Sequence, residues 1–249
     1  MFSLKDKKAI ITGAAGKGLG SGMARALLSA GASLVIVDIS SALDESVDEL
    51  STLGKVYGVH ADISTGEGRK KAFAEAISLF GGVDIFVNCA GIQRRSPSED
   101  FSAEDWNAVL EINLTATFDF CQLAGREMLK QGYGKIINVA SMLSFFGGYT
   151  VPAYAASKGG VAQLTKALSN EWASRGVNVN AIAPGYMATQ MNTKLIEDEE
   201  RNKKILARIP QGRWGTPEDV GGVVVFLASS ASDYINGAII PVDGGYLGC

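Results

Sequence analysis

A tyrosine and a lysine four residues apart, Tyr154 and Lys158, form the first pattern in the sequence that could do chemistry. A helix is predicted here, because apolar residues recur at helical spacing after the pair, at Val161, Leu164, Leu168 and Trp172. Residues four apart share one face of a helix. An ordinary tyrosine has a pKa of about 10, but a neighbouring positive charge favours the phenolate and lowers that value. The pair therefore predicts a tyrosine that exchanges a proton with a substrate oxygen. The alternative is a surface pair whose lysine stem lies along apolar surface.

Few other side chains in the sequence could carry a proton. The only histidine, His60, ends a strand-like run, and we interpret it as structural. A zinc site built on several histidines is therefore excluded, and a Ser-His-Asp mechanism has a single candidate base. The three cysteines, Cys89, Cys121 and Cys249, show neither metal-binding spacing nor a disulfide framework. We expect no metal site.

The composition describes a globular chain with no sign of a nucleic-acid or membrane partner. Its 249 residues allow one large α/β domain or two small ones, and they are 47% hydrophobic and 20% charged. The net charge of −3 argues against nucleic acid as a partner. No apolar run approaches the ~20 residues that span a bilayer, and residues 1–8 show no signal-peptide pattern. We therefore expect a cytoplasmic protein.

Short apolar runs alternate with helical patterns along the chain. Strands are predicted at 8–12, 33–38, 55–60, 83–87, 135–139, 178–183 and 238–242. Helices are predicted at about 20–30, 66–80, 114–131 and 154–175, with further starts near Ser102 and Thr216. This order predicts a parallel sheet covered on both faces. Residues 186–210 interrupt the alternation and are predicted to form an inserted helical flap over the substrate.

A glycine-rich turn, Gly13–Gly20, lies between the first strand and the first helix. Glycines allow the backbone to approach a pyrophosphate, and the helix N-terminus offers N–H donors to it. Asp38 ends the second strand, at a distance where a carboxylate can accept hydrogen bonds from a ribose and would repel a 2′-phosphate. The alternative is that Asp38 only begins a turn or caps the helix after Ser40.

Ligands of open parallel sheets bind beyond the carboxyl ends of the strands. Small or polar residues follow nearly every predicted strand, and together they predict a long cleft suited to a dinucleotide. They are Gly13–Gly20, Asp38, Asp62, Asn88–Gly91, Ser141 and Pro184–Gly185.

On these residues the chain resembles the short-chain dehydrogenases/reductases over essentially its whole length. The matching motifs are Thr12-Gly13 with its glycine turn, Asn88-Cys89-Ala90-Gly91, Asn113, Ser141, Tyr154-x-x-x-Lys158 and Pro184-Gly185. The resemblance implies one Rossmann-like, doubly wound α/β domain over residues 1–249, a nicotinamide cofactor and a homotetramer. It also implies that Tyr154 is the general acid/base, that Lys158 lowers its pKa and holds the nicotinamide ribose, and that Ser141 binds the reacting oxygen. Asn113 is expected from the resemblance to hold a proton-relay water at a helix irregularity.

The same resemblance assigns the binding residues. Cofactor contacts are expected from Gly13, Lys17, Gly18, Leu19, Gly20, Asp38, Ile39, Asp62, Ile63, Asn88, Ala90, Gly91, Tyr154, Lys158, Pro184, Gly185, Met187 and Thr189. Substrate contacts are expected from Gln93, Arg94, Arg95, Ser141, Leu143, Tyr154, Gly185 and Tyr186. NAD is expected in preference to NADP, because Asp38 would meet a 2′-phosphate and the next residue, Ile39, carries no charge.

The sequence departs from the family pattern at two places. The glycine turn has one extra residue between Gly13 and Gly18, and either Gly16 or Lys17 can be the insertion. After the fourth strand, Cys89 stands where the family usually has a second asparagine. We interpret this cysteine as a packing residue.

The second half of the chain carries a narrower resemblance. The stretches 140–145, 180–189 and 209–215 are similar to 2-dehydro-3-deoxy-D-gluconate 5-dehydrogenases, with gluconate 5-dehydrogenases as close neighbours. This resemblance implies an open-chain sugar acid as substrate. An acyl-carrier-protein or steroid reductase is an alternative that expects NADPH. A non-catalytic nucleotide sensor is another, although Asn113, Ser141, Tyr154 and Lys158 are all present.

A sugar acid carries a carboxylate, and a water-poor cleft must pair that charge. Arg94 and Arg95 follow Gly91 and are the nearest candidates in sequence. At most one is expected to face the site, because adjacent side chains of an extended loop diverge. The alternatives are that both are solvated, or that a flap cation such as Lys194 binds the carboxylate.

Overall fold

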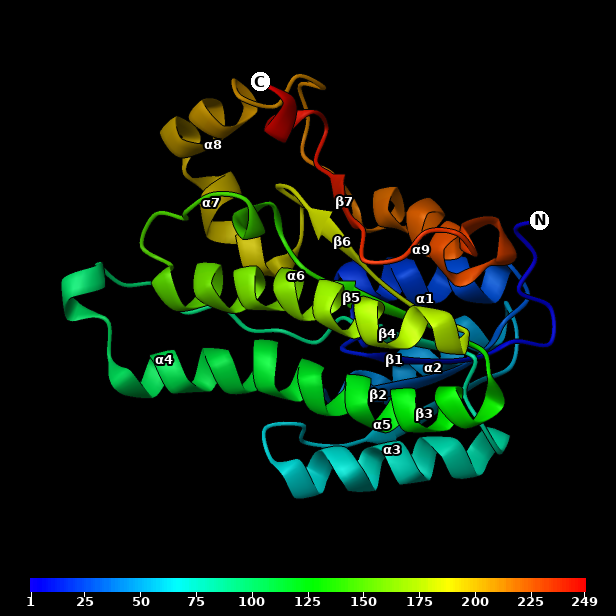
Figure 1. The fold of residues 1–249 in the computed structure, drawn as a ribbon. Coiled ribbons are helices and arrows are strands. Elements are labelled where there is room, and N and C mark those ends of the chain that lie inside the picture. Colours follow the sequence, from blue (N-terminus) through cyan, green and yellow to red (C-terminus); the bar gives the residue numbers. More distant parts are fainter.

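Seven parallel strands form one sheet in the computed structural model, which describes residues 1–249 (Figure 1). The strands are β1 (Lys8–Thr12), β2 (Ser33–Asp38), β3 (Val56–His60), β4 (Ile85–Asn88), β5 (Gly134–Val139), β6 (Val177–Pro184) and β7 (Ile239–Val242). Their order across the sheet is β3-β2-β1-β4-β5-β6-β7, so the direction of winding reverses between β1 and β4. Such a reversal opens a crevice at the carboxyl ends of the two strands.

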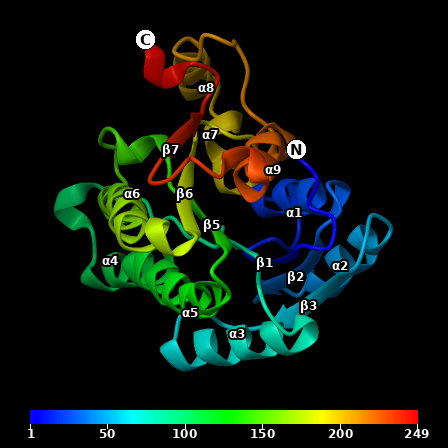
Figure 2. The same ribbon diagram turned by 45° about the vertical axis from the view of Figure 1, so that its right-hand side comes forward.

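Helices cover both faces of the sheet (Figure 2). They are α1 (Leu19–Ser29), α2 (Leu43–Ser51), α3 (Gly66–Phe80), α4 (Ala103–Leu110), α5 (Ala116–Gln131), α6 (Pro152–Trp172), α7 (Thr193–Glu197), α8 (Glu199–Leu206) and α9 (Gly221–Ala228). Helices α1, α2 and α9 pack on one face, and α3, α5 and α6 pack on the other. The predicted doubly wound parallel sheet is confirmed.

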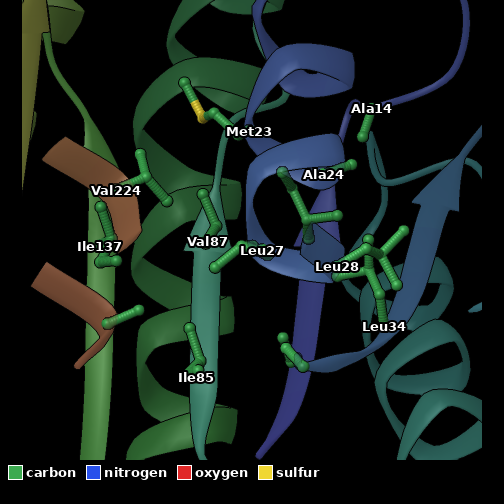
Figure 3. Packing of buried hydrophobic residues seen from close by; sticks show 14 of the residues in the cluster. Ala14, Met23, Ala24, Leu27, Leu28, Leu34, Ile85, Val87, Ile137 and Val224 are labelled. Atoms are coloured by element: carbon green, nitrogen blue, oxygen red, sulfur yellow. The ribbon is translucent and has the colours of Figure 1, made fainter. Parts of the chain in front are cut away.

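The two cores follow from the alternation of side chains along each strand. On β1, Ile11 packs into the cluster beneath α1 and α9, whereas Ile10 points to the cluster beneath α3, α5 and α6. Figure 3 shows the first of these clusters, in which Leu27 of α1 points toward Val87 of β4. Leu27 is fully buried, so truncating it to alanine should cost about 2–5 kcal/mol.

Local sequence signals set several element boundaries. The Ser102 hydroxyl accepts the Asp105 N–H at 3.0 Å, which caps α4 where the sequence predicts a helix start. At Thr216 the predicted start holds, but the first turn is a 3₁₀ turn, Pro217–Val220, and α9 follows it. No helix is both long enough and apolar enough to cross a membrane.

The stretch that interrupts the alternation holds the short helices α7 and α8. It has a small apolar cluster of its own, in which Leu195 and Ile205 pack with Met142 and Tyr246. Because Met142 directly follows Ser141, this packing holds α7 and α8 against the turn after β5.

Candidate active site

Helix α6 presents Tyr154 and Lys158 at the carboxyl end of β5. Pro152 begins the helix, where its missing N–H costs nothing. The Lys158 side chain is buried, and its Nζ donates a 2.6 Å hydrogen bond to the carbonyl oxygen of Val139. The same Nζ lies 5.7 Å from the centre of the Tyr154 ring. The expected face shared by the tyrosine and the lysine is present.

The turn after β5 places Ser141 beside this pair. The Ser141 hydroxyl accepts the Leu143 N–H at 3.1 Å, which fixes the side chain. Ser144 fastens the turn to α6, because its hydroxyl accepts the Ser141 N–H at 3.3 Å and donates to the Lys158 carbonyl at 2.6 Å. Sequence reasoning missed Ser144, because the capping-box signal has a glutamate or glutamine at the third residue after the serine.

The pKa of Tyr154 differs from the expectation. Burial raises the pKa of this phenol to about 12, although the neighbouring Ser141 hydroxyl favours the ionised form. Burial also lowers the pKa of Lys158 to about 8. The sequence predicts a lowered tyrosine pKa, and the structure contradicts this prediction because loss of hydration outweighs the hydrogen bond from Ser141. The arrangement therefore holds a protonated phenol at neutral pH.

Asn113 lies at the helix irregularity that was expected, a π-helical turn at Glu111–Thr115 between α4 and α5. Its side chain is fully buried and lines neither cavity of the site, and its expected role in holding a proton-relay water stays a prediction. The amide instead exchanges two hydrogen bonds with the backbone of Ile92, at 2.8 and 2.9 Å, and donates to Ser157 at 3.1 Å. The side chain of Asn113 thus ties the loop after β4 to helix α6.

A long cleft of about 410 Å³ runs along the carboxyl ends of the strands. Sixteen of the eighteen expected cofactor residues line it: Gly13, Gly18, Leu19, Gly20, Asp38, Ile39, Asp62, Ile63, Ala90, Gly91, Tyr154, Lys158, Pro184, Gly185, Met187 and Thr189. Sequence reasoning missed others, among them Val37, Ala61, Ile92, Ile112, Val139, Ala140, Gln190, Met191 and Asn192. All of these except Gln190 and Asn192 are apolar residues. They lie close in the sequence to the residues that were expected at the site.

Two expected cofactor residues do not line the cleft. Lys17 is exposed on the glycine turn. Asn88 is buried, and its amide donates to the Asn138 Oδ1 at 2.9 Å, which links β4 to β5 below the cleft. Cys89 does line the cleft, and it also packs against the core beneath α1. Burial raises the pKa of its thiol to about 12, so the thiol is neutral.

The glycine turn is fastened to the end of β2. Asp38 accepts the Ala15 N–H on one oxygen and the Ser40 N–H on the other, each at 2.9 Å. The Gly16 N–H donates to the Ser46 hydroxyl at 2.9 Å, and Gly16 has a φ of +75°, which favours glycine. The longer turn is therefore accommodated by a left-handed residue held against α2.

The cleft fits a dinucleotide. A Cβ built on Gly18, at the N-terminus of α1, meets no atom within 4 Å, so a phosphate can approach the first N–H groups of that helix. Gly13 lies so close to the loop after β4 that a Cβ would come 2.6 Å from Ala90. These two loops form the floor of the cleft at the switch in strand order, with Asp38 at one end and Tyr154 at the other.

A second cavity of about 320 Å³ lies beyond the catalytic candidates. Ser141 and Tyr154 line both this cavity and the long cleft. Seven of the eight expected substrate residues line it: Gln93, Arg95, Ser141, Leu143, Tyr154, Gly185 and Tyr186. A group bound here would meet a ligand of the cleft at the tyrosine and the serine.

Arg94 is the eighth, and it points away. Its Nε lies 3.3 Å from a carboxylate oxygen of Asp105 on α4, and it does not line the cavity. Lys194, the flap cation considered from the sequence, is exposed and lies outside the cavity as well. Two other cations of the flap, Arg201 and Arg208, do line the cavity, although the sequence did not single them out from Lys194.

Comparison with known proteins gives matches over the whole chain. A family model described as enoyl-(acyl carrier protein) reductase matches residues 13–247. The chain is 51% identical to the 2-dehydro-3-deoxy-D-gluconate 5-dehydrogenase of Bacillus subtilis (strain 168), over 99% of this chain and 96% of the relative.

Two solved structures have nearly the same fold as this chain. A protein from Beutenbergia cavernae that is assigned as an NAD(P)-dependent gluconate 5-dehydrogenase, with NADP bound at low occupancy, superposes with a TM-score of 0.96 at 44% identity, over 100% of this chain and 99% of that one. A gluconate 5-dehydrogenase from Burkholderia cenocepacia J2315, in complex with NADP and tartrate, gives 0.95 at 38% identity, over 100% and 98%.

Proposed function

Because the chain belongs to the short-chain dehydrogenase/reductase family, we propose that it transfers a hydride between NAD(H) and a hydroxyl or keto group of an open-chain sugar acid. The substrate would be of the 2-dehydro-3-deoxy-D-gluconate, 2-deoxy-D-gluconate or gluconate type, as the names of the relatives suggest. The observation that carries the proposal is the position of Ser141 and Tyr154, which line both the dinucleotide-sized cleft and the cavity beyond it.

The residues around the cavity divide the work of the reaction. The nicotinamide ring supplies or accepts the hydride when the cofactor is bound. The Tyr154 phenol exchanges the proton of the substrate oxygen, and the Ser141 hydroxyl holds that oxygen by a hydrogen bond. Lys158 places an ammonium group near the phenol, and this charge stabilises the phenolate while the proton is away.

The high pKa of Tyr154 suits proton donation. A phenol with a pKa of about 12 is protonated at neutral pH, so it can give a proton to the oxygen of a carbonyl that is being reduced. Oxidation of a hydroxyl needs the phenolate, which becomes more abundant as the pH rises.

The preference for NAD rests on the adenosine end of the cleft. Asp38 lines the cleft there with Ile39, whose side chain is exposed and uncharged. A 2′-phosphate would meet the Asp38 carboxylate without an arginine to offset it. Two relatives were crystallised with NADP, so the preference depends on these residues of this chain.

We also propose a cytoplasmic homotetramer. Support comes from the family resemblance and from large apolar side chains on neighbouring elements of the helical face, Trp106 on α4 and Phe118 on α5, which are 38% and 41% exposed. Large apolar side chains that are exposed in one subunit are candidates for contacts between subunits.

The proposed function can be tested by following NADH consumption with a panel of keto sugar acids, with NADPH run in parallel. We expect turnover of at least one six-carbon keto acid and a higher kcat/KM with NADH. Turnover confined to acyl thioesters or steroid ketones would contradict the proposed substrate class.

A further inference from the structure

The cavity beyond Ser141 and Tyr154 is lined by positively charged side chains and by no negatively charged ones. Its lining includes three arginines, Arg95, Arg201 and Arg208, and no aspartate or glutamate. The chain as a whole carries a net charge of −3, so this concentration of positive charge is local. A cavity lined in this way attracts an anion.

The three arginines come from two separate walls. Arg95 lies in the loop after β4, whereas Arg201 lies on α8 and Arg208 follows that helix by two residues. Arg201, Ile205 and Arg208 are spaced by four and three residues, so they share one face, and all three line the cavity. Arg95 and Arg208 are exposed and Arg201 is half-buried, so the arginines reach both the cavity and solvent. The neighbouring Lys203 and Lys204 lie outside the cavity.

None of the three forms an ion pair within the chain, unlike Arg69, Arg94 and Arg213. The Arg95 guanidinium donates only to neutral oxygens, those of Tyr149, Thr150 and Gln93, at 3.2 to 3.4 Å. The Arg208 guanidinium lies 4.4 Å from the centre of the Tyr246 ring. The pKa of Arg95 is lowered first by partial burial, although the residue as a whole is exposed, and second by the charge of Arg201. These two guanidinium groups therefore repel each other.

We propose that Arg95, Arg201 and Arg208 form a carboxylate-binding site, which holds the acid group of the substrate while its carbonyl or hydroxyl lies at Ser141 and Tyr154. This inference rests on the proposed function and adds the residues that recognise the acid. A guanidinium group presents paired N–H donors that match the two oxygens of a carboxylate. An anion between Arg95 and Arg201 also removes their repulsion.

The site explains how a sugar acid is distinguished from a neutral sugar. D-Gluconate and D-glucitol have the same carbon chain, and only gluconate ends in a carboxylate. The neutral sugar would leave the arginines without a counter-charge, so it should bind more weakly.

The test compares cavity arginines with matched cations outside the cavity. The variants Arg95→Gln, Arg201→Gln and Arg208→Gln are compared with Arg94→Gln and Lys203→Gln. The dissociation constants of D-gluconate and D-glucitol are measured by calorimetry in the presence of NADH, so that the readout does not depend on turnover. We expect Arg95→Gln and Arg201→Gln each to weaken gluconate binding by roughly tenfold, with Arg208→Gln in the same direction. Glucitol binding should stay unchanged, and the two control variants should bind gluconate as the wild type does.

The outcomes separate this site from the proposed reaction. If gluconate binding falls as expected but no sugar acid is turned over, the carboxylate site stands and the proposed function fails. If sugar acids are turned over but the three cavity variants bind gluconate like the wild type, the function stands and the carboxylate site is wrong. A wild-type protein that binds gluconate and glucitol equally, or neither, would also overturn the site.

Discussion

The Nζ atom of Lys158 donates a 2.6 Å hydrogen bond to the carbonyl oxygen of Val139, the last residue of β5. Ser141 follows two residues later, and the carbonyl oxygen of Lys158 accepts the hydroxyl of Ser144 from the same turn. These two hydrogen bonds therefore connect helix α6 to the end of β5 and to the turn that follows it. They fix the positions of Tyr154 and Ser141 relative to each other, which a proton transfer requires.

Replacing Tyr154 with phenylalanine should stop catalysis and leave the fold intact. The substitution removes the only hydroxyl proposed to exchange the proton, so kcat should fall by roughly 10²- to 10⁴-fold. Steady-state kinetics and thermal melting would measure the two effects. Tyr234→Phe is the control, because that side chain is fully exposed. Near-normal turnover by the Tyr154 variant would contradict the mechanism.

The two directions of the reaction should respond differently to pH. Burial raises the pKa of Tyr154 to about 12, so the phenol stays protonated over the neutral range. We expect kcat/KM for reduction to be flat near neutral pH, and kcat/KM for oxidation to rise by up to about tenfold per pH unit, because it needs the phenolate. An oxidation optimum at or below pH 7 would be incompatible with this tyrosine as the base.

The buried lysine should make stability depend on pH above 8. Burial lowers the pKa of Lys158 from 10.5 to about 8, so between these values the unfolded chain binds more protons at this site than the folded one. The contribution of Lys158 to the free energy of unfolding therefore rises with pH in that window. Tyr154 acts in the opposite sense above its ordinary pKa of 10, and the buried thiols of Cys89 and Cys121 do so above their ordinary pKa of 9.

Urea unfolding between pH 8 and pH 10 can isolate this contribution of the lysine. The difference in the free energy of unfolding between wild type and Lys158→Met should shift in favour of the wild type as the pH rises. Lys166→Met, at an exposed position of the same helix, should show no such trend. A difference that is constant across the window would mean that Lys158 is not titrating as described.

Removing the charge of Asp38 should weaken the discrimination against NADP. In Asp38→Asn the side chain keeps its shape and one acceptor for the N–H of Ala15 or Ser40, while the repulsion of a 2′-phosphate disappears. We expect the ratio of kcat/KM for NADH to that for NADPH to fall by about tenfold or more, in line with the ~1.5–3 kcal/mol of a charge-assisted contact. A wild-type enzyme that prefers NADPH would refute the basis of this prediction.

Arg69 should stabilise both the fold and the cleft. Its side chain is only 4% exposed and lies 2.8 Å from Asp119 and 2.9 Å from Glu111, and it donates to the Ile63 carbonyl at 2.8 Å. Arg69→Met should lower the free energy of unfolding by about 1–3 kcal/mol, because both carboxylates are partly solvated and can recover some hydration.

Arg69→Met should also weaken cofactor binding. Ile63 lines the cleft, and Glu111 begins the π-helical turn that carries Asn113. Urea unfolding and a cofactor titration would measure the two effects, with the exposed neighbour Lys70→Met as the control. Unchanged stability in Arg69→Met would show that the buried ion pairs contribute nothing net.

The sequence alone determined the framework of the protein and the pair at its centre. The strands, the helix starts at Ser102 and Thr216 and the Tyr154–Lys158 spacing could all be predicted, because each depends on residues within a few positions of one another. The divergence of Arg94 and Arg95 also followed from local geometry. Most of the residues that line the cleft could be predicted from the strand ends, since parallel strands present their carboxyl ends at one edge of the sheet.

Only the tertiary structure decided which distant side chains meet and how much water surrounds them. In the folded chain the Asn113 side chain is hydrogen-bonded to the backbone of Ile92. Arg201 and Arg208 of the flap line the same cavity as Arg95. The tertiary structure also reversed the expected direction of the Tyr154 pKa shift, because the cost of desolvating a phenolate depends on every element packed around it. Burial and convergence are properties of the folded chain as a whole, and no local pattern of residues encodes them.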